Sequence, residues 1–357
     1  MQVLRAVAAL MVVVSHGQAE ASALAARLGL GFQPAGWLPW NAGVDIFFVI
    51  SGFIIVHAAG PLHGRPRARR RFLAHRVARV VPLYWLMTSA YLAMVLVRPG
   101  LLNAPGGADP AYLAASYLFW PTARPDGAVT PLYSLGWTLN YEMAFYALFA
   151  LALPLSRRRA VAAVALSLAA LVTATRFAGT LPTPLAYWGD PIVLEFAFGL
   201  GLGLLRAEGL RLPDPARAGL AVAGLALLSL AGDAPVLPRA LAWGGPAALL
   251  VAAASLGRRE PEGGLVRAAA RLGDASYALY LVHPFAIRAV GLGGAALAAG
   301  LGLPGLVAAM LGAACAAALA VHRLVERPLD RILRRRLDPG ANPGRAPRRE
   351  AEHRERA

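Results

Sequence analysis

The chain has 357 residues, of which 58% are hydrophobic, and its mean hydropathy is +0.55. This composition is too apolar for an ordinary soluble domain and indicates a membrane protein. The formal net charge of +16 would suit a nucleic-acid-binding protein, but the arginines that produce it are concentrated in alternate loops between apolar stretches. That distribution follows the positive-inside rule, so we expect membrane lipids and no nucleic acid as the partner of this charge.

Apolar stretches bounded by Pro, Gly or Arg recur along almost the whole sequence. They predict an all-α, polytopic membrane helix bundle with about ten transmembrane helices, at 3–19, 43–59, 79–97, 131–154, 160–177, 190–206, 217–231, 240–256, 275–292 and 304–322. An apolar piece at 111–120 is too short to cross and is expected to be interfacial or re-entrant. An even number of spans, with arginine in alternate loops, places both termini in the cytoplasm.

Two regions are expected from the composition. Residues 1–325 form one transmembrane domain, and residues 326–357 form a disordered basic cytoplasmic tail, because few apolar residues follow Leu337. The single cysteine, Cys315, lies in an Ala-rich span without a cluster of cysteine or histidine around it. Neither an intramolecular disulfide nor a metal site is therefore expected.

Ionisable residues lie inside the first predicted span. Arg5 and His16 are eleven residues apart, which is close to three helical turns, so their side chains share one face about 16 Å apart along the axis. An ionisable group inside a bilayer is costly and usually faces a protein interior or a water-filled cavity. The pair indicates a line of polar groups along one face of the helix, here called the polar seam. A membrane enzyme or a transporter would need such a feature, and a simple membrane anchor would not.

The second span opens with GVDIFFVISGF at 43–53 and starts on the outer side, which places Asp45 near the depth of His16. A carboxylate beside an imidazole can orient it as a general base, so this pair is a catalytic candidate. Asp45 could equally cap its helix, and His16 could be a buried imidazole whose hydrogen bonds are satisfied.

Arginines also lead into the third span, in RFLAHRVARVVPLYW at 71–85. Arg76 and Arg79 are three residues apart and share a helical face at the cytoplasmic edge. Because the arginine fork suits phosphate, they predict a site for an anionic, nucleotide-like cytosolic ligand. The arginines at 65–71 need no ligand: they are explained by the orientation of the chain in the membrane and by contact with lipid headgroups.

Three further candidates lie in the fourth and ninth spans. Glu142, in SLGWTLNYEMAFY at 134–146, falls in the outer half of its span, where a carboxylate needs either a functional role or an arginine partner. Trp137 and Tyr141 beside it could contact substrate or be interfacial aromatics. His283 is a second imidazole that is expected to face the bundle and to bind substrate.

Taken together, several blocks resemble the bacterial integral-membrane acyltransferase family 3, in order over residues 2–328. They are LRA…H in the first span, GVDIFFVISGF, RFLAHRVARVVPLYW, LGWTLNYEMAFY, GDASYALYLVHPF and VERP. The second and fourth blocks are most similar to the exopolysaccharide-production O-acetyltransferase branch. The resemblance implies an acyl-CoA co-substrate on the cytoplasmic side, expected to be acetyl-CoA, with no permanently bound cofactor. By motif position it implies donor binding by Arg5, Arg76 and Arg79, and catalysis by His16, Glu142 and Asp45.

These observations predict an inner-membrane O-acyltransferase that moves an acyl group from cytosolic acyl-CoA to a hydroxyl of a surface, exopolysaccharide or lipid-linked glycan. His16 would accept the proton of that hydroxyl, because the ordinary pKa of imidazole lies near neutral pH. Two alternatives remain. The polar seam could be a proton or solute path in a transporter or flippase, or the acceptor could be a small hydrophobic molecule such as a macrolide or a lipid.

Overall fold

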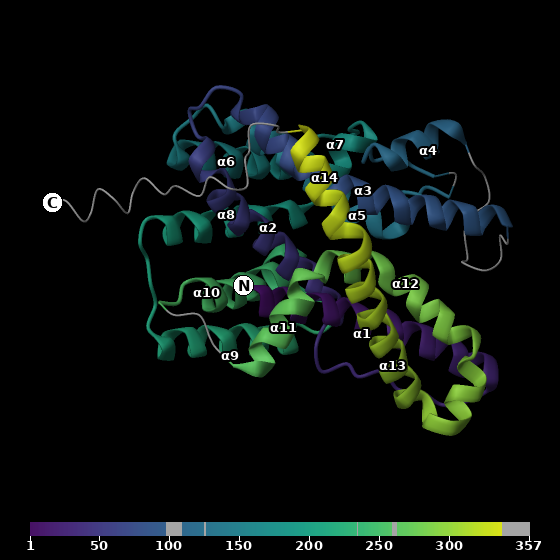
Figure 1. The fold of residues 1–357 in the computed structure, drawn as a ribbon. Coiled ribbons are helices and arrows are strands. Elements are labelled where there is room, and N and C mark those ends of the chain that lie inside the picture. The colour runs from purple at the N-terminus through teal and green to yellow at the C-terminus, as the bar shows by residue number, and fades with distance from the viewer. Residues whose placement is uncertain (98–108, 125, 234, 259–262, 338–357) are drawn as a thin grey trace.

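The computed structural model describes residues 1–97, 109–124, 126–233, 235–258 and 263–337. Over these residues the chain is all-helical and contains no β-strand, as the sequence predicts. The long helices pack side by side (Figure 1), and one lies in each predicted span. Their bounds are α1 Gln2–Leu28, α2 Gly43–Ala59, α3 Ala68–Val97, α5 Trp137–Ala152, α6 Arg157–Phe177, α8 Leu194–Ala207, α9 Asp214–Ala231, α10 Gly245–Ser255, α12 Ser276–Leu292 and α13 Gly294–Val321.

Six helical segments of the described chain are long and apolar enough to cross a membrane. They are Gln2–Leu28, Trp40–Leu62, Ala68–Val97, Arg157–Phe177, Asp214–Ala231 and Gly294–Leu337. The remaining helices in the predicted spans are shorter, so ten crossings and two cytoplasmic termini remain predictions. The helices nevertheless indicate a multi-pass membrane protein, because a soluble fold has no use for so many exposed apolar helical faces.

Shorter helices connect or cover the long ones. Helix α4 (Pro110–Tyr117) occupies most of the predicted short apolar piece, and Asp109 caps it by accepting a hydrogen bond from the N–H of Ala111 at 3.1 Å. Helix α7 (Thr183–Trp188) and a π-helical turn, η6 (Ala240–Gly244), precede longer elements, and α11 (Gly264–Asp274) packs on α1. The sequence pattern did not predict α11 as a separate helix.

Helices α2 and α8 pack closely against each other, and small residues explain this approach. A Cβ added to Gly52 would collide with the carbonyl oxygen of Phe196, and one added to Gly199 would collide with backbone of α2. Small residues at facing positions allow membrane helices to approach this closely. Beside them, Phe196 stacks between Phe145, with ring centroids 4.3 Å apart, and Phe48, with centroids 4.6 Å apart. This aromatic stack joins α5 to α2 and α8.

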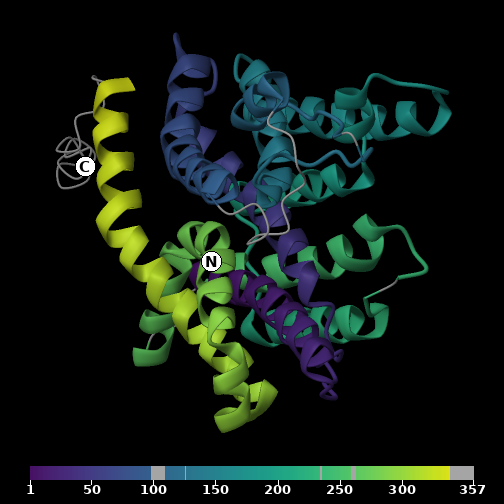
Figure 2. The same ribbon diagram turned by 90° about the vertical axis from the view of Figure 1, so that its right-hand side faces the viewer.

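The predicted disordered tail is corrected in its first part. Helix α13 continues through a π-helical turn, η7 (His322–Glu326), into α14 (Arg327–Leu337), which packs against α3 (Figure 2). Charge pairing explains why this polar segment is ordered: Glu326 forms an ion pair with Arg79, and Asp330 accepts a hydrogen bond from Arg334 at 2.7 Å. Residues 338–357 of the predicted tail lie outside the described residues.

Candidate functional site

A cavity of about 510 Å³ lies between α1, α2, α3, α5, α12 and the η7–α14 segment. This volume is in the range of small-molecule sites. Its positive charge comes from three separate helices, through Arg5, Arg76, Arg79, Arg327 and Arg334. Apolar side chains of α2 and α5 form another part of the wall, among them Val44, Phe47, Phe48, Ile54 and Leu139. The cavity therefore presents a cationic region and an apolar region to the same ligand.

Four of the residues predicted from sequence line this cavity, namely Arg5, Arg76, Arg79 and Glu142. They come from α1, α3 and α5, so only the fold brings them together. Their roles remain predictions, but charges that converge from several helices are what an anionic ligand requires. The lining does not include the other predicted site residues, His16, Asp45, Trp137, Tyr141 and His283.

Arg5 is held at the junction of α11 and α12. Its Nε donates to the carbonyl oxygen of Gly273 at 3.3 Å and to Oγ of Ser276 at 3.1 Å, and its Nη2 donates to the same hydroxyl at 2.8 Å. All these acceptors are neutral. The contacts orient the guanidinium without cancelling its charge, which leaves that charge available to an anion in the cavity.

Arg76 and Arg79 differ in how their charges are compensated. Arg79 Nη1 lies 3.2 Å from Glu326 Oε1, and the other oxygen of Glu326 lies 2.7 Å from His322 Nδ1. The guanidinium carbon of Arg76 lies 5.7 Å from the ring centroid of Tyr146, and its Nε is buried without a hydrogen-bond partner in the described chain. The charge of Arg76 is thus less compensated than that of Arg79, which also contacts the C-terminal segment.

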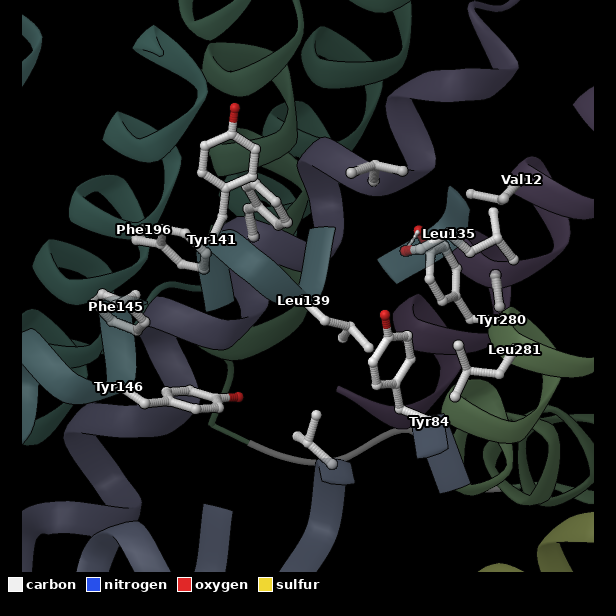
Figure 3. Packing of buried hydrophobic residues seen from close by; sticks show 14 of the residues in the cluster. Val12, Tyr84, Leu135, Leu139, Tyr141, Phe145, Tyr146, Phe196, Tyr280 and Leu281 are labelled. Atoms are coloured by element: carbon white, nitrogen blue, oxygen red, sulfur yellow. Dashed lines mark hydrogen bonds between the residues drawn. The ribbon is translucent and has the colours of Figure 1, made fainter. Parts of the chain in front are cut away.

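Glu142 is half-buried and is held by hydroxyl groups. Its Oε1 accepts hydrogen bonds from Ser51 Oγ at 3.0 Å and from the hydroxyl of Tyr146. The ion pairs of the described residues do not include Glu142, so the alternative of a structural arginine partner is not what this structure shows. In Figure 3 the hydroxyl of Tyr146 points toward the region of Leu139, which also lines the cavity, whereas Tyr141 points away from it.

His16 and His283 form a pair next to the cavity. His16 Nδ1 lies 3.1 Å from His283 Nε2, and the ring centroids are 4.8 Å apart. Tyr280 lines the cavity, and its ring centroid lies 6.2 Å from that of His283. The hydroxyl of Tyr280 is fixed in turn, 3.0 Å from Thr138 Oγ1. Tyr280 thus connects the cavity wall to the histidine pair.

The predicted approach of Asp45 to His16 is not what the structure shows. The fully buried carboxylate of Asp45 accepts hydrogen bonds from Arg239 Nε and Nη2, both at 2.9 Å. The Arg239 guanidinium lies over Trp243 at 4.7 Å and over Trp137 at 5.9 Å. The physical reason is that the α2 face bearing Asp45 meets η6, where a bidentate guanidinium is a stronger partner for a carboxylate than a neutral imidazole.

Trp137 and Tyr141 contribute to packing between α5 and α7. The rings of Tyr141 and Tyr187 stack with centroids 4.4 Å apart, and the Tyr187 hydroxyl donates to the carbonyl oxygen of Trp137 at 2.8 Å. Tyr141 is buried. A role for these two residues in substrate binding remains a prediction, as does one for His283, which has no exposed surface.

Sequence reasoning missed several residues of the cavity wall, including Ser51, Tyr146, Ser276 and the arginines of α14. A signal for the last of these is present in the sequence. Arg327, Asp330 and Arg334 are spaced by three and four residues, so they share one face of a helix. The high arginine content of the segment hid this periodicity, because it is also typical of a disordered basic tail.

A polytopic helix bundle with an arginine-lined cavity beside the half-buried His16 and the buried His283 is the arrangement of a membrane protein whose polar site lies inside the bundle. Residues 1–323 match a family model described as an acyltransferase domain, the acyltransferase 3 family. The match covers most of the chain, which therefore belongs to this family. The protein is a multi-pass membrane acyltransferase, as the sequence motifs predict.

Three curated proteins extend this relationship. The chain is 37% identical to the exopolysaccharide production protein ExoZ of Rhizobium meliloti over 274 residues, covering 74% of this chain and 81% of that protein. It is 29% identical to acyltransferase MdmB of Streptomyces mycarofaciens, over 70% of this chain and 68% of that protein. It is 29% identical to a putative peptidoglycan O-acetyltransferase, YrhL of Bacillus subtilis, over 48% of this chain and 30% of that protein. No solved structure matches the chain significantly.

Proposed function

We propose that the protein transfers an acetyl group from cytosolic acetyl-CoA to a hydroxyl of a surface or exopolysaccharide glycan, in the cell inner membrane. The observation that carries the proposal is the cavity in which arginines of α1, α3 and α14 meet Glu142. A CoA thioester is polyanionic at one end and apolar along its arm, and the wall has the same two characters. The glycan acceptor is supported by the name of the relative from Rhizobium meliloti.

The cavity wall suggests how the donor lies. Its phosphates contact Arg76 and the arginines of α14, and its pantetheine arm follows the apolar side chains of α2 and α5 toward Tyr280. This orientation directs the thioester toward His16, which lies behind Tyr280 and His283. The charged end of the donor then stays at the arginine-rich, cytoplasmic end of the bundle, where the sequence places the positive loops.

The chemistry follows from general base catalysis. His16 takes the proton of the acceptor hydroxyl as its oxygen attacks the thioester carbonyl carbon. The carbon–sulfur bond breaks, the acyl group remains on the oxygen as an ester, and the departing thiolate takes the proton to give free CoA. Among the described residues, Glu142 accepts hydrogen bonds from two neutral hydroxyl groups, so its charge remains available to orient an N–H or O–H of the reactants.

The direct test is acyl transfer by the isolated protein. Detergent-purified enzyme is incubated with acetyl-CoA that is radiolabelled in the acetyl group and with a lipid-linked glycan. We expect label on the glycan and stoichiometric release of CoA. A transporter or flippase would leave acetyl-CoA intact while moving solute across the membrane of a proteoliposome, and label on a macrolide or a lipid alone would replace the glycan as acceptor.

His16 is tested in the same assay. His16→Ala is expected to abolish transfer while the protein still accumulates in the membrane. His16→Gln keeps the approximate shape of the side chain but cannot take the proton, and we expect it to fail as well. Full activity of either variant would remove His16 from the reaction.

A further inference from the structure

His283 is fully buried on α12 and has a defined hydrogen-bond partner at each ring nitrogen. Its Nδ1 lies 3.1 Å from the carbonyl oxygen of Leu279, one turn earlier, and its Nε2 lies 3.1 Å from His16 Nδ1. The next residue, Pro284, has no N–H to donate to this turn of the helix. The carbonyl oxygen of Tyr280, four residues before Pro284, therefore receives no backbone hydrogen bond from that position.

The order of donors and acceptors along this chain of contacts fixes the proton positions. A carbonyl oxygen only accepts, so His283 Nδ1 carries a proton and donates it to Leu279. A neutral imidazole has one N–H, which makes His283 Nε2 an acceptor. His16 Nδ1 must then be the donor in the contact between the rings.

The consequence concerns the other nitrogen of His16. With its proton on Nδ1, a neutral His16 has its lone pair on Nε2. The hydrogen bond found for His16 in the described chain is the one to His283, and His16 Nε2 is not among the buried atoms that lack a partner. His16 is half-buried, so Nε2 can be approached by a reactant.

We propose that His283 is a positioning residue that holds His16 as the Nδ1–H tautomer and so presents Nε2 as the base. This inference rests on the proposed function. His283 takes the place that a carboxylate occupies in many histidine-based catalytic sites, where the partner of the second nitrogen selects tautomer and ring orientation. A neutral partner achieves this orientation without placing a further charge inside the membrane, where an unpaired charge is costly.

The experiment compares two substitutions of His283. His283→Leu fills the space but cannot accept from His16, so we expect kcat to fall about 100-fold with little change in KM for acetyl-CoA. His283→Gln offers an amide oxygen to His16 and an N–H to the carbonyl of Leu279, and should recover most of the rate. Equal loss in both variants, together with equally lowered melting temperatures, would show that His283 only packs the core and would overturn the proposal.

His57 provides a matched control. It lies on α2, and its Nδ1 is 3.3 Å from the carbonyl oxygen of Phe53, also one turn earlier. Within the described part of the chain, no second histidine ring is paired with it. His57→Leu and His57→Gln should leave kcat unchanged. If the two His57 variants lowered kcat as the His283 variants do, the effect would come from helical histidines in general and the proposal would fall.

Solid-state NMR of the enzyme labelled with ¹⁵N-histidine tests the tautomer without an activity assay. The spectra of wild type, His16→Ala and His283→Gln assign the signals of the pair. We expect a protonated Nδ1 and an unprotonated Nε2 at His16 in the wild type. A protonated Nε2 would overturn the inference, whereas the expected tautomer in an enzyme that does not use acetyl-CoA would place the error in the proposed function.

Discussion

Asp45 and Glu142 are both carboxylates inside the helix bundle, yet their surroundings differ in kind. Asp45 has no exposed surface and forms two charge-assisted hydrogen bonds with Arg239, whose guanidinium lies against two tryptophan rings. Glu142 lines the cavity and accepts hydrogen bonds from neutral hydroxyls. A carboxylate thus occurs once in a buried ion pair and once with its charge facing a cavity.

The two arginine environments follow the same division. Arg239 is committed to Asp45, and Glu195, also fully buried, is close enough to interact electrostatically with both. In the cavity, Arg5 is oriented by neutral acceptors, and Arg76 retains an unpaired Nε. A charge that is matched within the protein stabilises the fold, whereas a charge left unmatched in a cavity predicts a ligand. The presence of a charged residue in a membrane span does not by itself show whether that residue stabilises the fold or binds a ligand.

The largest effect is expected at the closed pair. Arg239→Met would leave the fully buried carboxylate of Asp45 without its cation. Removing one partner of a buried ion pair typically costs about 3–5 kcal/mol, so the variant should fail to accumulate or should melt at a much lower temperature. Expression and the melting curve in detergent measure this, and Arg217→Met, whose partner Asp214 is largely exposed, is the control. An Arg239→Met protein as stable as the wild type would contradict the assignment of the Asp45–Arg239 pair to the fold.

The next effect is expected at Glu142. Glu142→Gln keeps the shape of the side chain and can still accept from Ser51 and Tyr146, but it lacks the charge. We expect turnover to fall about 100-fold while the melting temperature stays near that of the wild type. Melting and acetyl transfer are measured on one preparation. A stable, fully active variant would remove Glu142 from the reaction, and an unstable one would assign it to the fold together with Asp45.

A smaller effect is expected at the arginines of α3. Arg76→Ala removes a charge-assisted contact and should weaken acetyl-CoA binding by about 1.5–3 kcal/mol. Arg76→Lys should recover part of the loss, because an ammonium lacks the bidentate fork. Arg79→Ala should also weaken binding, and it should lower stability in addition, since Glu326 loses its cation. If the substitutions weaken the binding of CoA and of dephospho-CoA equally, the arginines contact the diphosphate. If the affinity is unchanged, Arg76 and Arg79 serve only to orient the chain in the membrane.

The smallest effect is expected at α14. Arg327→Ala and Arg334→Ala each remove one lining charge, and we expect KM for acetyl-CoA to rise about two- to fivefold, the range of partly exposed charges, with kcat unchanged. Arg335→Ala and Arg336→Ala, which do not line the cavity, should leave KM as it is. If all four substitutions raise KM equally, the helix acts through its net charge and not through specific contacts.

Much of the fold could be predicted from the sequence, because apolar stretches of membrane-spanning length carry their own signal. A helix lies in each predicted span, and α4 lies in the apolar piece before Pro121 that is too short to cross. The helix of the C-terminal segment could not be predicted in the same way. Its helix depends on Glu326 pairing with Arg79, some 250 residues earlier in the chain, and no local pattern reports that contact.

Contacts between distant segments also limited the prediction of the site. Motif position identified Arg5, Arg76, Arg79 and Glu142, and the fold brings them into one cavity. Similar depth in the membrane suggested that Asp45 would meet His16, but depth does not fix the direction in which a residue faces around its helix. The pairing of His16 with His283 joins α1 to α12 and could not be read from either segment alone.

The most direct test of the donor site is a cryo-electron-microscopy structure of the wild-type enzyme with CoA bound. The account predicts that the phosphates lie in the cavity among Arg76, Arg327 and Arg334, with the arm running along α2 and α5 toward Tyr280 and the thiol on the side of His16. A second cavity, of about 400 Å³, lies at the arginine-rich loop 64–69. Density for CoA in that loop, with the cavity beside Glu142 empty under turnover conditions, would contradict the account.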